Sequence, residues 1–226
     1  MFHDLVSLFY PETCNCCSTE LAKNEKTVCT TCLHELPVTN YHLYNENPVK
    51  KVFYGRAEIE NATALLYFRK KGMVQTLIHN LKYRGHEQIS TFLGEWVGSD
   101  LSEIEDYQSL DVVIPVPLHK LKLKSRGFNQ VEGFARKIAE KLDAEYVDDV
   151  LVKKSPGNTQ ALRNRLSRWG NMEETFLLEN SEKIQNKNVL LVDDIITTGA
   201  TLEACIEKIQ QIEGVKVSIA TMAITN

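Results

Sequence analysis

The stretch VLLVDDIITTGATL, residues 189–202, decides the fold and raises the question of function. Its apolar run, Val189 to Val192, is typical of a parallel strand that is buried on both faces. Two adjacent carboxylates, Asp193 and Asp194, follow the run, and the turn TTGAT then leads into apolar residues at helical spacing over 200–212. We therefore expect a strand, a turn and a helix, with the turn at the ligand-binding edge of an α/β sheet.

The rest of the chain supplies the elements that such a sheet needs. The segment 214–224 is expected to be a second strand, which completes a right-handed βαβ unit with the first. Apolar patterns predict further strands at 51–59, 62–69 and 112–116, and helices at 72–86, 88–97 and 131–142. The expected fold class is α/β.

The turn after the carboxylates has the composition of a phosphate site. Gly199 lets the backbone approach a ligand closely, and N–H groups at the start of a helix can hold a phosphate. Thr197, Thr198 and Thr201 add hydroxyl groups. The two carboxylates would repel a phosphate, but they suit neighbouring hydroxyls, so the stretch predicts a 5-phosphorylated ribose. The alternative is a pair of capping acids before an ordinary turn, and neither a Walker loop nor a G-x-G-x-x-G motif is present.

Cations cluster where a second buried strand ends. In DVVIPVPLHKLKLKSRGFNQ, residues 111–130, two prolines stop the strand, and no acidic residue lies between Val112 and Val131. The cations of this segment are Lys120, Lys122, Lys124 and Arg126. Their place at the end of a strand predicts an anion site, with a solvated charged loop as the alternative. Lys82 and Arg84 end the expected helix 72–86, where they also complement the helix dipole.

A long polar connection follows at 151–171. It contains Pro156 and Gly157 and carries five cations, which are Lys153, Lys154, Arg163, Arg165 and Arg168. A segment of this length and composition inside a compact domain is often a lid over a site. A basic surface loop is the alternative.

Five of the six cysteines fall between residues 14 and 32. Cys14, Cys17, Cys29 and Cys32 form two C-x2-C pairs, and two such knuckles complete a tetrahedral Zn²⁺ site. Four thiolates leave no open position for a reacting water, so the zinc is expected to be structural. Three alternatives stay open: the knuckles are oxidisable or vestigial and bind no zinc, Cys16 replaces Cys14 or Cys17, or His34 replaces a cysteine.

Composition limits the class of protein. The net charge of −4 gives no general reason to expect nucleic-acid binding. No apolar run approaches the roughly 18–20 residues that a membrane span needs. The first residues, MFHDLVSLFYPETC, lack the pattern of a signal peptide, so a cytoplasmic protein with reduced thiols is expected.

These motifs together resemble a known family. VLLVDDIITTGATL resembles the phosphoribosyl-diphosphate motif of type I phosphoribosyltransferases. The PVP…RGFNQ pattern in 111–130, LKYRG at 81–85 and the four-cysteine N-terminal segment resemble the ComF family of competence-related proteins. The resemblance implies a type I phosphoribosyltransferase fold, with a five-stranded, largely parallel sheet flanked by helices. It also implies a zinc-binding module over 1–48 and a phosphoribosyltransferase-like domain over 49–226.

The resemblance assigns roles to residues of this chain. Asp193 and Asp194 would bind the ribose hydroxyls, and the 151–171 segment would be the catalytic loop. The 5-phosphate would be held by Thr197, Thr198, Gly199, Ala200 and Thr201. The pyrophosphate would lie near Arg126, Lys82 and Arg84. The loop would act through Gln160, Arg168 and Asn171, with Arg168 as the catalytic candidate. Two departures concern this loop: Lys153 stands where the family often has arginine, and Thr159 is adjacent to the glutamine instead of three residues before it.

The implied reaction displaces pyrophosphate from C1 of phosphoribosyl diphosphate by a nucleophile, commonly a nitrogen, with Mg²⁺ bridging substrate oxygens. No pattern in 52–110 identifies that acceptor. A different class of function is an accessory of natural competence that binds single-stranded DNA or DNA-uptake proteins, or senses phosphoribosyl diphosphate without turnover. Phosphate contacts for DNA would come from 119–126 and 163–168, and stacking from Phe128 and Trp169.

Overall fold

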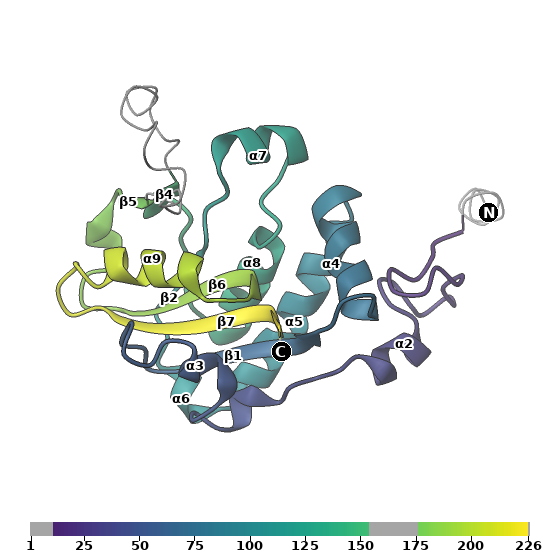
Figure 1. The fold of residues 1–226 in the computed structure, drawn as a ribbon, viewed down its shortest axis with the longest axis horizontal. Coiled ribbons are helices and arrows are strands. Elements are labelled where there is room, and N and C mark those ends of the chain that lie inside the picture. Colours follow the sequence, from purple (N-terminus) through teal and green to yellow (C-terminus); the bar gives the residue numbers. More distant parts are fainter. Residues whose placement is uncertain (1–10, 154–175, 226) are drawn as a thin grey trace, which may run out of the picture.

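The computed structural model describes residues 11–153 and 176–225 and has an α/β architecture (Figure 1). Its five-stranded sheet is parallel throughout and has the order β1-β7-β6-β2-β3. The strands are β1 (Ala62–Phe68), β2 (Val112–Pro115), β3 (Glu145–Tyr146), β6 (Asn188–Ile196) and β7 (Lys216–Thr225). A separate antiparallel pair is formed by β4 (Leu151–Lys153) and β5 (Phe176–Leu178). The expected fold class is confirmed.

Helices cover both faces of the sheet, and each face has its own core (Figure 1). One face packs against α4 (Met73–Tyr83), α5 (Gln88–Ser102) and α8 (Glu132–Leu142). The other packs against α3 (Pro48–Lys51) and α9 (Ala200–Ile209). Strand β6 supplies both cores in alternation, with Leu190 and Val192 on the first face and Val189 and Leu191 on the second. This burial on both faces explains why its apolar run is continuous.

The remaining elements within 11–153 and 176–225 are short. They are α2 (Thr30–Glu35), α6 (Glu105–Gln108), α7 (Lys120–Arg126) and the 3-10 helices η1 (Tyr41–Leu43) and η3 (Ser181–Lys183). Among the residues described, no helix is long and apolar enough to cross a membrane.

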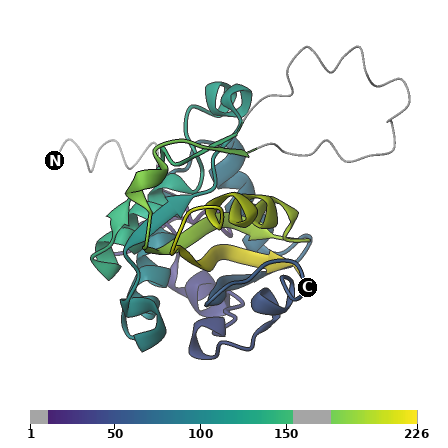
Figure 2. The same cartoon turned by 90° about the vertical axis from the view of Figure 1, so that its left-hand side faces the viewer.

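Two expectations about local structure were wrong. The segment 51–59 is not a strand, because the Asn47 side chain accepts hydrogen bonds from the N–H groups of Val49 and Lys50 and starts α3 with Pro48 at its first position. The cationic stretch 120–126 is not a loop but helix α7, which ends at Gly127 in the left-handed conformation. Helix α7 has no buried residue and stands out from the body of the domain (Figures 1 and 2).

The N-terminal cysteine segment shares a core with the main domain. Cys14, Cys16 and Cys32 are buried in the same apolar cluster as Leu81 of α4 and Leu93 of α5. The Asn80 side chain of α4 also donates a hydrogen bond of 3.0 Å to the Asn15 carbonyl. Further along, Val38 pairs with Leu66 of β1, and the predicted boundary at 48/49 falls within α3. That boundary stays a prediction.

Candidate functional site

The two carboxylates lie near the carboxyl end of β6, in the centre of the sheet. Strand β6 continues past them to Ile196, and Asp193 is opposite Thr221 of β7. Asp194 is buried, with 6% of its surface exposed, whereas Asp193 is half-buried. The Asp194 backbone N–H donates a hydrogen bond of 2.8 Å to Oδ1 of Asp193. The pair therefore lies at the carboxyl ends of the parallel strands, as the sequence predicts. The Asp193 carboxylate is held by the backbone of Asp194.

Two segments far away in the chain hold Asp194. Lys82, in the last turn of α4, forms an ion pair of 2.8 Å between its Nζ and Oδ2 of Asp194. The side-chain amide of Gln130, just before α8, donates a 2.7 Å hydrogen bond to the same oxygen. The structure thus brings together the predicted residues Lys82 and Asp194, and it adds Gln130 to them.

Gln130 also connects the carboxylates to α7. Its Oε1 accepts a hydrogen bond from the Arg126 guanidinium, whose carbon lies 5.8 Å from the centre of the Tyr83 ring. Arg126 is therefore joined to Asp194 through one amide group. Arg84, by contrast, is exposed at the C-cap of α4, and its side chain has no hydrogen bond or ion pair within 11–153 and 176–225. Gln130 lies inside the RGFNQ motif, which was the only signal for it.

Burial, together with the neighbouring charge of Asp194, raises the pKa of Asp193 to about 7, although Lys82 and Lys153 oppose this rise. The unfolded chain has the ordinary value of 3.8. The folded protein therefore holds an extra proton between these two pH values, and the stability that this proton contributes is lost as the pH rises through 7.

We expect Asp193→Asn to stabilise the unliganded protein more at pH 8 than at pH 5, because asparagine removes a charge that is costly only when it is ionised. Thermal unfolding of both proteins at the two pH values measures the difference. An equal shift in Tm at pH 5 and pH 8 would contradict the raised pKa.

The predicted phosphate loop forms the turn between β6 and α9. Gly199 is the N-cap of α9 and has a φ of +76°, which favours glycine. The Thr198 hydroxyl accepts a long, 3.5 Å hydrogen bond from the Ala200 N–H. Thr197, Thr198, Gly199, Ala200 and Thr201 thus follow the carboxylates in one strand, turn and helix.

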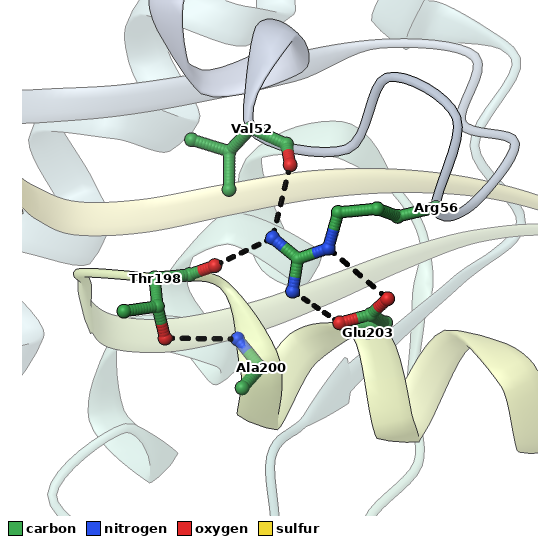
Figure 3. A network of polar contacts seen from close by, with 5 residues as sticks. All are labelled: Val52, Arg56, Thr198, Ala200 and Glu203. Atoms are coloured by element: carbon green, nitrogen blue, oxygen red, sulfur yellow. Dashed lines mark hydrogen bonds and ion pairs between the residues drawn. The ribbon is translucent and has the colours of Figure 1, made fainter.

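An arginine that sequence reasoning missed holds this loop (Figure 3). Arg56, in the turn after α3, donates hydrogen bonds to the carbonyls of Thr198 and Val52 and forms a two-pronged ion pair with Glu203 of α9. Arg56 and Glu203 are 147 positions apart, and no local pattern signals the contact.

Several predicted loop residues lie outside the described part of the chain. Arg168 falls within 154–175, as do Gln160, Arg163, Arg165, Trp169 and Asn171. Lys153 ends β4, where its ammonium lies 5.3 Å from the Phe176 ring centre.

The four predicted cysteines form one cluster. The Sγ atoms of Cys14, Cys17, Cys29 and Cys32 all lie within 4.8 Å of one another. A tetrahedron with Zn–S bonds of about 2.3 Å has S–S edges of about 3.8 Å, and the Sγ atoms of Cys17 and Cys29 are 3.8 Å apart. Backbone N–H groups of residues 16 and 29 point at Cys14 Sγ. The donor set and spacing fit a tetrahedral metal ion, and the cluster includes neither Cys16 nor His34.

The pKa values of the thiols distinguish the cluster from the neighbouring Cys16. Hydrogen bonding with the side chain and backbone of Thr19 lowers the pKa of Cys17 to about 6, so this thiol readily becomes a metal-binding thiolate. Burial, together with the nearby cysteines, raises the pKa of Cys16 to about 12. Cys16 is therefore a poor ligand in this conformation.

Part of this chain matches a known domain family. The Phosphoribosyl transferase domain family matches residues 132–225, which include the carboxylates and the 197–201 loop. The competence protein ComFC of Streptococcus pneumoniae is 27% identical over 206 residues, which cover 91% of this chain and 77% of that protein. The DNA utilization protein YhgH of Escherichia coli O157:H7 is 25% identical over 192 residues, which cover 84% and 80% of the two chains.

Solved structures with a similar arrangement include a purine phosphoribosyltransferase from Pyrococcus horikoshii Ot3. It has a TM-score of 0.37 and 20% identity, and the match covers 60% of this chain and 73% of that one. The fold described above is the α/β phosphoribosyltransferase-like fold, with a four-cysteine cluster near the N-terminus. This chain is thus similar to the ComF and YhgH proteins, matches the Phosphoribosyl transferase domain family over residues 132–225 and has a four-cysteine cluster.

Proposed function

We propose that this protein binds phosphoribosyl diphosphate with Mg²⁺ and transfers the phosphoribosyl group to a nitrogen nucleophile in the cytoplasm. The observation that carries the proposal is the adjacency of two unlike half-sites on one strand, turn and helix. Asp193 and Asp194 are hydrogen-bond acceptors, whereas the 197–201 loop at the start of α9 presents backbone donors. A ribose 5-phosphate group needs both.

The hydrogen bonds around Asp193 and Asp194 support separate roles for the two oxygens of each carboxylate. The contacts within the protein use Oδ1 of Asp193 and Oδ2 of Asp194. In the proposal, the second oxygen of each carboxylate accepts hydrogen bonds from the ribose hydroxyls. Lys82 contacts the Asp194 carboxylate directly and Arg126 contacts it through Gln130. In the proposal, these two cations attract the pyrophosphate. Catalysis then consists mainly of positioning and of neutralising the leaving group.

Magnesium fits the donor chemistry of this site. Carboxylate and substrate oxygens are the ligands that Mg²⁺ prefers, and it commonly binds through substrate phosphates and few protein groups. When bound, the ion would neutralise charge on the departing pyrophosphate. The protein's own residues would orient the ribose and keep the two carboxylates next to it.

A screen of nucleobases and amines for pyrophosphate release tests the proposed function. The full-length protein is incubated with phosphoribosyl diphosphate and Mg²⁺, and we expect release that depends on one class of nitrogen acceptor. Omission of Mg²⁺ is the control. Binding of phosphoribosyl diphosphate without release across a broad panel would contradict the transferase proposal and favour a ligand sensor, and the absence of binding would contradict both.

Binding of single-stranded DNA is the second candidate function, and the exposure of α7 favours it. Lys120, Lys122 and Lys124 are exposed on this protruding helix, and Tyr83 nearby has 70% of its surface exposed. Phe128, by contrast, is half-buried against the core and is poorly placed for stacking. The relatives' names, competence protein and DNA utilization protein, agree with such a role. A separate titration of the full-length protein with single-stranded DNA tests it, and an affinity that falls steeply with added salt would support this candidate.

A further inference from the structure

The segment Val52–Arg56 packs directly on the predicted phosphate loop. A Cβ atom added to Gly199 would lie 2.6 Å from the Val52 side chain and 3.2 Å from the Phe53 ring. Phe53 itself is fully buried in the core that contains Ile196 and Leu202, the residues flanking the loop. The segment is therefore a fixed support rather than a passing contact.

Arg56 connects the Val52–Arg56 segment to the 197–201 loop, and all three nitrogens of its guanidinium donate hydrogen bonds (Figure 3). Nη1 donates to the Thr198 carbonyl at 2.8 Å and to the Val52 carbonyl at 3.1 Å. Nε donates to Oε1 of Glu203 at 3.1 Å, and Nη2 pairs with Oε2 of the same side chain. One planar group thus joins Val52, the loop and α9 through four hydrogen bonds, which is one more than the three N–H groups of a lysine can donate.

The contact with Thr198 determines where the next N–H points. In a trans peptide the C=O and N–H bonds point in opposite directions. Because the Thr198 oxygen is held toward Arg56, the Gly199 N–H is directed to the opposite side of the loop. The Glu203 carboxylate neutralises the cation at the start of α9, where a positive charge would otherwise oppose the helix dipole.

We propose that Arg56 is a positioning residue that holds the 197–201 loop ready to receive the 5-phosphate of the ligand. This inference rests on the proposed binding of phosphoribosyl diphosphate. Arg56 acts through the loop backbone, and the pyrophosphate end of the ligand, near Lys82 and Arg126, is independent of it.

Ribose 5-phosphate and pyrophosphate, measured separately by calorimetry with Mg²⁺, test the inference. We expect Arg56→Ala to weaken ribose 5-phosphate binding about 10- to 100-fold, the range for loss of charge-assisted hydrogen bonds, and to leave pyrophosphate binding within about twofold. Arg56→Lys keeps the charge but not the forked guanidinium, and we expect it to bind ribose 5-phosphate nearly as weakly as Arg56→Ala does. Arg136→Ala is the matched control, since it removes an Arg–Glu ion pair with Glu132 on α8.

Three outcomes would overturn the inference. They are an unchanged affinity of Arg56→Ala for ribose 5-phosphate, an equal loss for both ligands, and full recovery in Arg56→Lys, which would mean that charge alone acts. If Arg56→Ala does not fold, Arg56→Lys and the amide chemical shift of Gly199 decide the question. Failure of the proposed binding of phosphoribosyl diphosphate is distinguishable, because the wild-type protein would then bind neither ligand.

Discussion

Replacing both carboxylates, as Asp193→Asn with Asp194→Asn, is expected to weaken phosphoribosyl-diphosphate binding by about 100-fold or more. Each charge-assisted hydrogen bond contributes about 1.5–3 kcal/mol, so two of them account for this loss. The fold should persist, because asparagine has nearly the same shape and Asp194 is held by Lys82 and Gln130, of which Gln130 can also pair with an amide. Calorimetry with Mg²⁺ measures the affinity.

The chain contains its own control for this experiment. Val147-Asp148-Asp149 repeats the Val-Asp-Asp sequence of 192–194 at a surface site, where Asp149 pairs with Lys183. Asp148→Asn with Asp149→Asn changes the net charge by the same amount and should leave the affinity unaltered. Unchanged binding in the 193/194 variant, or equal losses in both variants, would refute the assignment of the ribose site.

Loss of the metal from the cysteine cluster is expected to have the largest effect on stability. We expect one zinc ion per chain in the purified protein and none in Cys17→Ser with Cys29→Ser. Structural zinc binds to zinc-finger peptides with about 10–16 kcal/mol. A decrease of even about 4 kcal/mol in the free energy of unfolding would lower the Tm of a protein of this size by about 8–16 °C. Metal analysis and thermal unfolding, with and without a chelator, check both expectations.

Cys16→Ala is the control for the metal experiment. Cys16 lies beside the cluster but outside it, so this variant should retain one zinc ion. It also decides between the alternatives that spacing alone left open, because loss of zinc here would make Cys16 a ligand. A wild-type protein that contains no zinc and is unaffected by a chelator would refute the structural-metal hypothesis.

The elements around Asp193 could be predicted because their signals are local. A strand buried on both faces, a glycine turn and an amphipathic helix each leave a pattern within about ten residues. The same holds for the four cysteines, whose spacing reflects two short knuckles. These are the parts of the site that sequence reasoning predicted and that the structure brings together.

The other parts depend on contacts that no local pattern records. Gln130 reaches Asp194 across 64 positions, and Arg56 reaches Thr198 across 142. The segment 51–59 was mistaken for a strand because its β-forming residues, including Phe53, are buried beside the loop and not within the sheet. There the Asn47 cap and Pro48 outweigh β propensity.

The sheet order also has a consequence for how the protein is made. Strand β1 has β7 as its neighbour in the sheet, and Ala62 is paired with Ile219, about 150 residues later in the chain. At a translation rate of about 5–20 residues per second, β1 waits on the order of 10 s or more for its partner. During that time its unpaired edge and apolar side chains are exposed to other nascent chains. Metal binding by the cysteine segment, which emerges before the strands of the sheet, would order the surface beside α4 while the sheet is still incomplete.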